Sequence, residues 1–198
     1  MTIADRYGPW ALVTGASDGI GQATARHLAA AGVHVVLVAR REPALRDLAE
    51  ELERSHHIQT RVVAVDLARP AAAAEVADAC AGVDVGLVVL AAGFGAAGPF
   101  LASPSATALE MIDVNVTAVT ALTHVMGGRL VARGRGGIVV FGSILGWQGV
   151  PGQAVYAATK AYVQTLARGC TANWPTAAST SCPSRPARCT PVSRRAPA

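Results

Sequence analysis

The 198-residue sequence predicts a doubly wound α/β fold, in which a parallel sheet carries helices on both faces in one three-layer domain. Short runs rich in β-branched residues alternate along the chain with alanine- and leucine-rich stretches of helical character. The run 33–39 is almost entirely apolar, as expected of a strand that helices cover on both faces. Repeated strand–helix–strand units of this kind join parallel strands through right-handed crossovers.

Each predicted strand is a short apolar run followed by a small or charged residue. The five strands are expected at 10–14, 33–39, 61–65, 85–91 and 138–141. Doubly wound sheets bind their ligands beyond the carboxyl ends of the strands. The residues that follow these runs are therefore the first candidates for a functional site.

Helices are expected in the intervals between the strands, where apolar residues recur at helical spacing. The predicted helices cover 19–31, a stretch through Leu45, Leu48 and Leu52, the alanine-rich 71–80, a long stretch through Leu109, Ile112, Val116, Val119 and Leu122, and 154–167. Gly32 is expected to close the first of them, because glycine favours the end of a helix. The whole pattern indicates a Rossmann-like architecture.

The composition suits a compact domain with a substantial core. Hydrophobic residues make up 52% of the chain and charged residues 15%, which excludes a disordered protein. The longest apolar run, 85–97, is interrupted by glycines and is too short to cross a bilayer. The chain does not open on a secretory signal, so we expect a cytoplasmic protein without a membrane partner.

The net charge of +4 does not indicate a nucleic-acid partner, because residues 1–168 balance thirteen basic against thirteen acidic residues. The excess comes from four arginines in the last thirty residues: Arg185, Arg188, Arg194 and Arg195. A nucleic-acid-associated function through this basic segment stays a weaker alternative. The four cysteines match no zinc spacing, so we expect neither a metal site nor a disulfide framework.

A glycine-rich segment follows the first predicted strand and opens the first helix. It carries the phosphate-binding candidates Gly15, Ser17, Gly19, Ile20 and Gly21. Glycines there permit a tight turn and close approach of the backbone to a pyrophosphate, while the helix start supplies N–H groups and a favourable dipole. The alternative is a tight strand–helix connection, but the position in an alternating chain favours a dinucleotide site.

Two arginines, Arg40 and Arg41, follow the second predicted strand. NAD-binding domains usually place a carboxylate there for the ribose hydroxyls, whereas an arginine accommodates a 2′-phosphate. Guanidinium groups suit a phosphate, so the sequence favours NADP over NAD. The alternative is that both arginines are solvated at a strand end.

The third and fourth strand ends add candidates for the same coenzyme pocket. Asp66 and Leu67 follow the third strand, where a carboxylate can accept a hydrogen bond from an adenine amine. Ala92 and Gly93 follow the fourth strand and offer the coenzyme a surface with few side-chain atoms. Either pair can also be a plain turn at a strand end.

The catalytic candidates are Asn115, Ser143, Tyr156 and Lys160. Tyr156 and Lys160 are four residues apart on a predicted helix and share one face, where the ammonium group favours the phenolate form. Ser143 ends the fifth strand, where a hydroxyl can hydrogen-bond a substrate oxygen. Asn115 is a poor helix former within the long helix, so we expect it to break the hydrogen-bond ladder and hold a water.

These residues resemble the classical short-chain dehydrogenase/reductase (SDR) family over about residues 10–168. The matching positions are Gly15, Gly19, Gly21, Asp66, Asn115, Ser143, Tyr156 and Lys160. The resemblance implies hydride transfer to or from a nicotinamide, with Tyr156 as acid/base and Ser143 polarising a carbonyl. It also implies that Lys160 holds the ribose and that Asn115 supports a proton relay.

The resemblance also bears on the coenzyme, the substrate and the oligomeric state. Arg40 stands where the NADP-preferring branch of the family carries an arginine. The segment 90–93 reads Leu-Ala-Ala-Gly where the family usually has Asn-Asn-Ala-Gly, so hydrogen bonds that brace the coenzyme pocket are expected to be missing. The substrate would be a small carbonyl or alcohol compound, and homo-oligomers, usual in the family, are doubtful here.

The last thirty residues do not fit the fold. Residues 171–198 contain five prolines and no acidic residue, and they show neither helical nor strand periodicity. We therefore expect a domain at 1–168 that lacks its last strands, followed by an irregular segment at 169–198. The segment is interpreted as frameshifted or truncated, because a one-base shift of the codon register can turn 179–192 into a strand-like run with a Pro-Gly turn. A catalytically impaired nucleotide-binding remnant without turnover is the alternative function.

Overall fold

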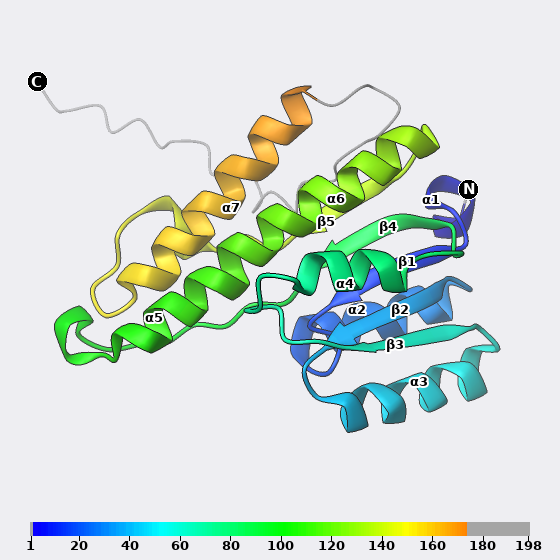
Figure 1. Cartoon of the computed structure of the whole chain (residues 1–198), viewed down its shortest axis with the longest axis horizontal. Coiled ribbons are helices and arrows are strands. Elements are labelled where there is room, and N and C mark those ends of the chain that lie inside the picture. Colours follow the sequence, from blue (N-terminus) through cyan, green and yellow to red (C-terminus); the bar gives the residue numbers. More distant parts are fainter. Residues whose placement is uncertain (1, 174–198) are drawn as a thin grey trace, which may run out of the picture.

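The computed structural model describes residues 2–173, which form a parallel five-stranded sheet in the order β3-β2-β1-β4-β5 (Figure 1). The strands are β1 (Trp10–Thr14), β2 (His34–Ala39), β3 (Thr60–Ala64), β4 (Val85–Leu90) and β5 (Gly137–Val140). Each lies within one or two residues of its predicted run. The strand order reverses at β1, which pairs with β2 on one side and β4 on the other. The predicted doubly wound α/β fold is confirmed.

The helices connect the strands as crossovers. They are α1 (Ile3–Tyr7), α2 (Gly19–Ala30), α3 (Glu42–His56), α4 (Ala72–Ala79), α5 (Ser105–Ile112), α6 (Ala118–Arg133) and α7 (Ala154–Asn173). Two 3₁₀ turns, η1 (Phe100–Ala102) and η3 (Ile144–Trp147), and a π-helical turn, η2 (Asp113–Thr117), complete the described elements. None of the helices within 2–173 is long and apolar enough to span a bilayer.

The sheet separates two hydrophobic cores, which gives the predicted three layers. Alternate residues of a strand point to opposite faces. Leu12 of β1 accordingly packs with α4, α6 and α7, while the neighbouring Val13 packs with α2 and α3 (Figure 1). Leu12 and Val13 are both fully buried, so β1 is covered on both sides as its composition predicts.

The long predicted helix between β4 and β5 is interrupted at the expected place. Asn115 lies in η2, where the hydrogen bonds widen from the α to the π pattern between α5 and α6. The local break expected from a poor helix former is confirmed. Two apolar residues of this stretch, Leu109 and Ile112, are exposed, whereas Met111 between them is buried.

Helix α7 continues to Asn173, five residues past the domain boundary at 168 that the sequence predicts. No proline lies between Ala154 and Pro175, so the backbone can extend the helix by more than a turn beyond 168. The frameshift interpretation and the irregular character of the remaining segment concern 174–198, which lie outside the described residues.

Candidate active site

The candidate site lies at the carboxyl ends of β1, β4 and β5, beside the point where the strand order reverses. The loop after β1 packs directly against the loop after β4. A Cβ on Gly15 would lie 2.9 Å from Cα of Ala92, and one on Gly21 would overlap the carbonyl oxygen of Gly15. Gly15 also has a φ of +68°, which favours glycine. These glycines therefore let α2 begin immediately above the strand ends.

The start of α2 presents backbone donors toward open space. Asp18 caps the helix by accepting a hydrogen bond of 2.7 Å from the Gly19 N–H. The N–H groups of Ile20 and Gly21 have no acceptor within the helix, because the first turn lacks a preceding turn. Gly19 has a φ of +51° and no heavy atom within 4 Å of the position a Cβ would take. The residues present therefore fit a pyrophosphate at this helix start.

The two arginines after β2 lie at the rim of the same site. Arg40 donates to the Glu110 carboxylate on α5 at 3.0 Å. Arg41 donates to the backbone oxygen of Ser17 at 3.1 Å and lies 3.4 Å from the Asp18 carboxylate. Both guanidinium side chains are 59% exposed. An anion that reaches this rim thus meets two accessible guanidinium groups beside the phosphate-binding loop.

The strand-end residues of the coenzyme pocket have different surroundings. Ala92 donates its N–H to Oγ1 of Thr14 at 3.1 Å, which joins the ends of β1 and β4. Asp66 uses Oδ1 to accept from the Ala68 N–H at 3.0 Å, so part of its carboxylate already stabilises its own turn. The Leu67 side chain is buried in the core with α4, and only its backbone can contribute to a pocket.

Asn115 fastens three segments of the site to one another. Its Oδ1 accepts from the Phe94 N–H at 3.1 Å, and its Nδ2 donates to the Phe94 carbonyl at 2.9 Å. The same Nδ2 donates to Oγ1 of Thr159 on α7 at 3.1 Å. The Asn115 residue is only 1% exposed, so these bonds form away from bulk water. A Cβ on Gly93 would lie 2.9 Å from Oδ1, which explains the glycine there.

Tyr156 and Lys160 lie on α7 facing the loop after β4. A Cβ on Gly95 would approach the Tyr156 ring to 3.0 Å, and Lys160 Nζ lies 5.7 Å from the centroid of that ring. Lys160 Nζ also donates to the Phe141 carbonyl at the end of β5 at 2.9 Å. Burial lowers the pKa of Lys160 from its ordinary value. The expected pair is thus brought together on one helix face.

Ser143 follows β5 and begins η3. Its Oγ accepts a hydrogen bond from the Leu145 N–H at 3.2 Å, which leaves the hydroxyl proton for another acceptor. Its backbone carbonyl accepts from Gln164 Nε2 on α7 at 2.7 Å and from the Gly146 N–H at 3.0 Å. The serine is therefore anchored to the helix that carries Tyr156.

Three residues of the site were not predicted from the sequence. Thr159 bridges Asn115 and the Tyr156 carbonyl, and it lies between Tyr156 and Lys160 in the sequence. Gln164 lies one helical turn after Lys160 on the same face of α7, and this position could be predicted from the spacing. Its hydrogen bond to the Ser143 carbonyl could not be predicted from the sequence. Glu110 carries no sequence signal, because its partner Arg40 lies 70 positions away.

The arrangement combines an anion-binding region with a proton-transfer group. Backbone donors and two arginines lie after β1 and β2, while a hydroxyl follows β5 and a phenol and an ammonium group lie on α7. Such a site can hold a phosphate-bearing ligand and exchange a proton with an oxygen of a second compound.

Comparison with known proteins agrees with this chemistry. The family model described as short chain dehydrogenase matches residues 9–178. The chain is 36% identical to a 7beta-hydroxysteroid dehydrogenase of Clostridium sardiniense over 169 residues, which are 85% of this chain and 65% of that protein. It is 34% identical to very-long-chain 3-oxoacyl-CoA reductase-A of Danio rerio over 171 residues, covering 84% of this chain and 54% of that protein. The chain thus spans less than two thirds of the length of these relatives.

Solved structures show the same fold. A short-chain dehydrogenase from Sphingobium yanoikuyae in complex with NADPH superposes with a TM-score of 0.81 at 32% identity, covering 89% of this chain and 72% of that one. A bulky-bulky ketone specific alcohol dehydrogenase from Comamonas testosteroni gives a TM-score of 0.79 at 33% identity, with coverages of 83% and 66%.

Proposed function

Because the chain belongs to the short-chain dehydrogenase family, we propose that it is an NADP-dependent oxidoreductase that interconverts a carbonyl and an alcohol. The observation that carries the proposal is the gathering of three side chains against the loop after β4, next to the loop that fits a pyrophosphate: Asn115 and Lys160 lie beside Gly93, and Tyr156 lies beside Gly95. Ser143, anchored to the same helix, completes the set. The proposed substrate is a small carbonyl or alcohol compound.

The chain's own groups supply the proton chemistry. In the direction of reduction, the Ser143 hydroxyl donates a hydrogen bond to the carbonyl oxygen and polarises the C=O bond. The Tyr156 hydroxyl then gives its proton to that oxygen and becomes a phenolate, and in oxidation the phenolate takes the alcohol proton back. When bound, a nicotinamide coenzyme supplies or accepts the hydride that completes the change at carbon.

Lys160 and Asn115 support this transfer in different ways. The Lys160 ammonium, held by the Phe141 carbonyl, is a positive charge near the Tyr156 ring and favours the phenolate. We also assign it the role of holding the coenzyme ribose. Asn115 keeps the loop after β4 in place against α7, and a water held beside it is proposed to relay protons to solvent.

The proposed preference for NADP rests on the rim after β2. Arg40 and Arg41 follow β2, where NAD-binding domains carry an acidic side chain that hydrogen-bonds the ribose hydroxyls. Their guanidinium groups are accessible to a 2′-phosphate. The Sphingobium yanoikuyae neighbour is itself a complex with NADPH. Asp66 is proposed to contribute to the adenine pocket through the part of its carboxylate that the turn does not use.

A binding experiment tests the coenzyme assignment. We expect the double variant Arg40→Ala/Arg41→Ala to raise the dissociation constant for NADPH by roughly 10- to 100-fold, because two charge-assisted contacts to phosphate are lost. The constant for NADH is expected to change less than about two-fold. Titration of coenzyme fluorescence with the full chain measures both. The variant Arg26→Ala, which removes an arginine from an exposed ion pair between α2 and α3, is the matched control.

Equal weakening of NADPH and NADH in the double variant would contradict the NADP assignment. The alternative function, nucleotide binding without turnover, would show normal titrations but no consumption of NADPH with any carbonyl compound. No feature of the described residues favours that alternative, because Tyr156 and Lys160 lie together on α7 and Ser143 is anchored to the same helix through Gln164.

A further inference from the structure

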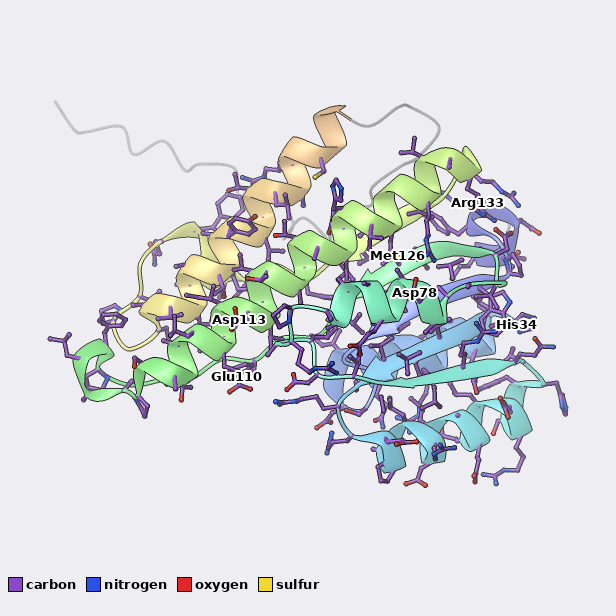
Figure 2. The ribbon with its side chains drawn as sticks, in the orientation of Figure 1. His34, Asp78, Glu110, Asp113, Met126 and Arg133 are labelled. Atoms are coloured by element: carbon purple, nitrogen blue, oxygen red, sulfur yellow. The ribbon has the colours of Figure 1, made fainter. Side chains whose placement is uncertain are left out.

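The two arginines at the coenzyme rim are each paired with a carboxylate from another part of the chain. Arg40 holds Glu110 of α5 at 3.0 Å, and Arg41 lies 3.4 Å from Asp18 at the start of α2. Figure 2 shows Glu110 toward the end of α5 that approaches the carboxyl ends of the strands. Two positive and two negative groups therefore share the rim, and a 2′-phosphate has to compete with the carboxylates for the guanidinium groups.

The two carboxylates differ in what else they do. Asp18 also caps α2 through the Gly19 N–H, so it has a structural task in the phosphate loop. The Glu110 carboxylate instead pairs with the Arg40 guanidinium and, within the described residues, caps no helix. Its side chain is 44% exposed, so water can solvate it once Arg40 leaves. Glu110 can therefore release Arg40 at little cost to the fold.

We propose that Glu110 is a specificity-determining residue, whose carboxylate competes with the 2′-phosphate of the coenzyme for Arg40. Without a phosphate, the ion pair keeps the Arg40 guanidinium at the rim. When a 2′-phosphate binds, it takes the place of the carboxylate, and the remaining negative charge of Glu110 repels it. Glu110 thus lowers the affinity for NADP(H) without touching the reacting atoms, and this rests on the proposed NADP-dependent function.

The test replaces the charge while keeping a hydrogen-bond acceptor of the same length. We expect Glu110→Gln to tighten binding of NADPH and of adenosine 2′-monophosphate by roughly two- to five-fold, the range of exposed ion pairs. Binding of NADH and adenosine 5′-monophosphate is expected to stay unchanged. Isothermal titration calorimetry on the full chain measures all four ligands, and none of these readouts depends on turnover.

A double-variant cycle tests whether Glu110 acts through Arg40. In the Arg40→Ala background, Glu110→Gln should have less than half of its effect on adenosine 2′-monophosphate. The matched control is Glu51→Gln, which removes the same charge from the ion pair of Glu51 in α3 with Arg26 in α2. The Glu51 side chain is 41% exposed, close to the value for Glu110. Glu51 lies nine residues into α3, roughly 14 Å along the helix from its start beside β2.

The following results would overturn the proposal. These are no change in Glu110→Gln, equal tightening of phosphate-bearing and phosphate-free ligands, or an undiminished effect in the Arg40→Ala background. Failure of the proposed function has a different signature, because the unmodified chain would then bind NADPH no better than NADH. A stronger effect of Glu51→Gln than of Glu110→Gln would also count against a local role.

Discussion

Lys160 carries a partly buried positive charge that the proposed chemistry needs. It is the only lysine in the chain, and burial lowers its pKa below the ordinary value of 10.5. A lysine whose pKa is lower in the folded than in the unfolded state binds its proton less tightly when folded. The folded chain is therefore destabilised at every pH below the folded pKa, and the penalty disappears as the pH rises toward 10.5. The hydrogen bond to Phe141 offsets part of this cost.

We expect Lys160→Met to raise the urea midpoint of unfolding at neutral pH while it abolishes most turnover. The thioether fills the space of the lysine stem without a charge to desolvate. The gain in stability should shrink as the pH rises through the folded pKa of Lys160. Lys160 of the unmodified chain then loses its charge, and the cost of desolvating that charge disappears. Urea unfolding at several pH values measures this. A midpoint that falls, or a gain that does not change with pH, would show that Lys160 costs the fold nothing.

The positions of the proposed catalytic residues could be predicted from the sequence, because each follows a recognisable strand or lies on a recognisable helix. Tyr156 and Lys160 share a helix face by their spacing alone, and Ser143 follows a run of apolar residues. The partner of Arg40 was not predictable, since the helix that carries Glu110 meets it only in the folded chain. Local sequence patterns therefore indicate the candidate catalytic residues, whereas ion pairs between distant segments depend on the tertiary structure.

The loop between β1 and α2 depends on glycines for two physical reasons. Gly15 needs a positive φ, and Gly21 needs the absence of a Cβ, because a methyl group there would overlap the Gly15 carbonyl oxygen. The second requirement involves backbone on both sides, so no side-chain rotation can relieve it. The predicted phosphate-binding loop is thus also the contact that places α2 against the sheet.

We expect Gly21→Ala to abolish NADPH binding and to lower the free energy of unfolding by roughly 2–4 kcal/mol, as severe overpacking does. The matched control is Gly128→Ala in α6, where nothing lies within 4 Å of the added Cβ. That helical substitution should instead stabilise the chain by about 0.5–1 kcal/mol. Urea unfolding and coenzyme titration of both variants make the comparison. Normal NADPH binding by Gly21→Ala would refute the close packing of this loop.

Strands and helices differ in how well the sequence predicts their limits. The strands are short apolar runs with clear ends, and β1 has the bounds predicted. Asn115 marked the break between α5 and α6, because asparagine favours local disruption of a helix. Helix α1 was missed, although Thr2 and Asp5 form a capping box that the sequence displays. The predicted end of α7 at 167 was also wrong, because the helix continues to Asn173. A change in composition does not by itself end a helix.

At the scale of the whole molecule, β5 is an edge strand among the described residues. An unpaired strand edge can pair with further strands. The family model matches up to residue 178, and the chain spans 65% of the 7beta-hydroxysteroid dehydrogenase of Clostridium sardiniense. The frameshift interpretation of the last segment stays a prediction, which the nucleotide sequence across codons 167–172 can decide.

The proposed function needs two parts of this fold: the loop after β1 is proposed to hold the coenzyme, and Tyr156 of α7 is proposed to act as acid/base. Tyr162 provides an internal control, because it lies on the same helix with its hydroxyl 3.0 Å from Thr120 Oγ1 and outside the proposed chemistry. Replacement of either tyrosine by phenylalanine removes one oxygen and leaves the ring.

The most direct test is the rate of NADPH oxidation by the full chain with a panel of ketones and aldehydes, compared between Tyr156→Phe and Tyr162→Phe. We predict that at least one carbonyl compound is reduced. Tyr156→Phe should lower kcat by at least roughly 100-fold at an unchanged dissociation constant for NADPH, and Tyr162→Phe should leave the rate nearly unchanged. NADPH binding without turnover, or equal rates in the two variants, would contradict the account.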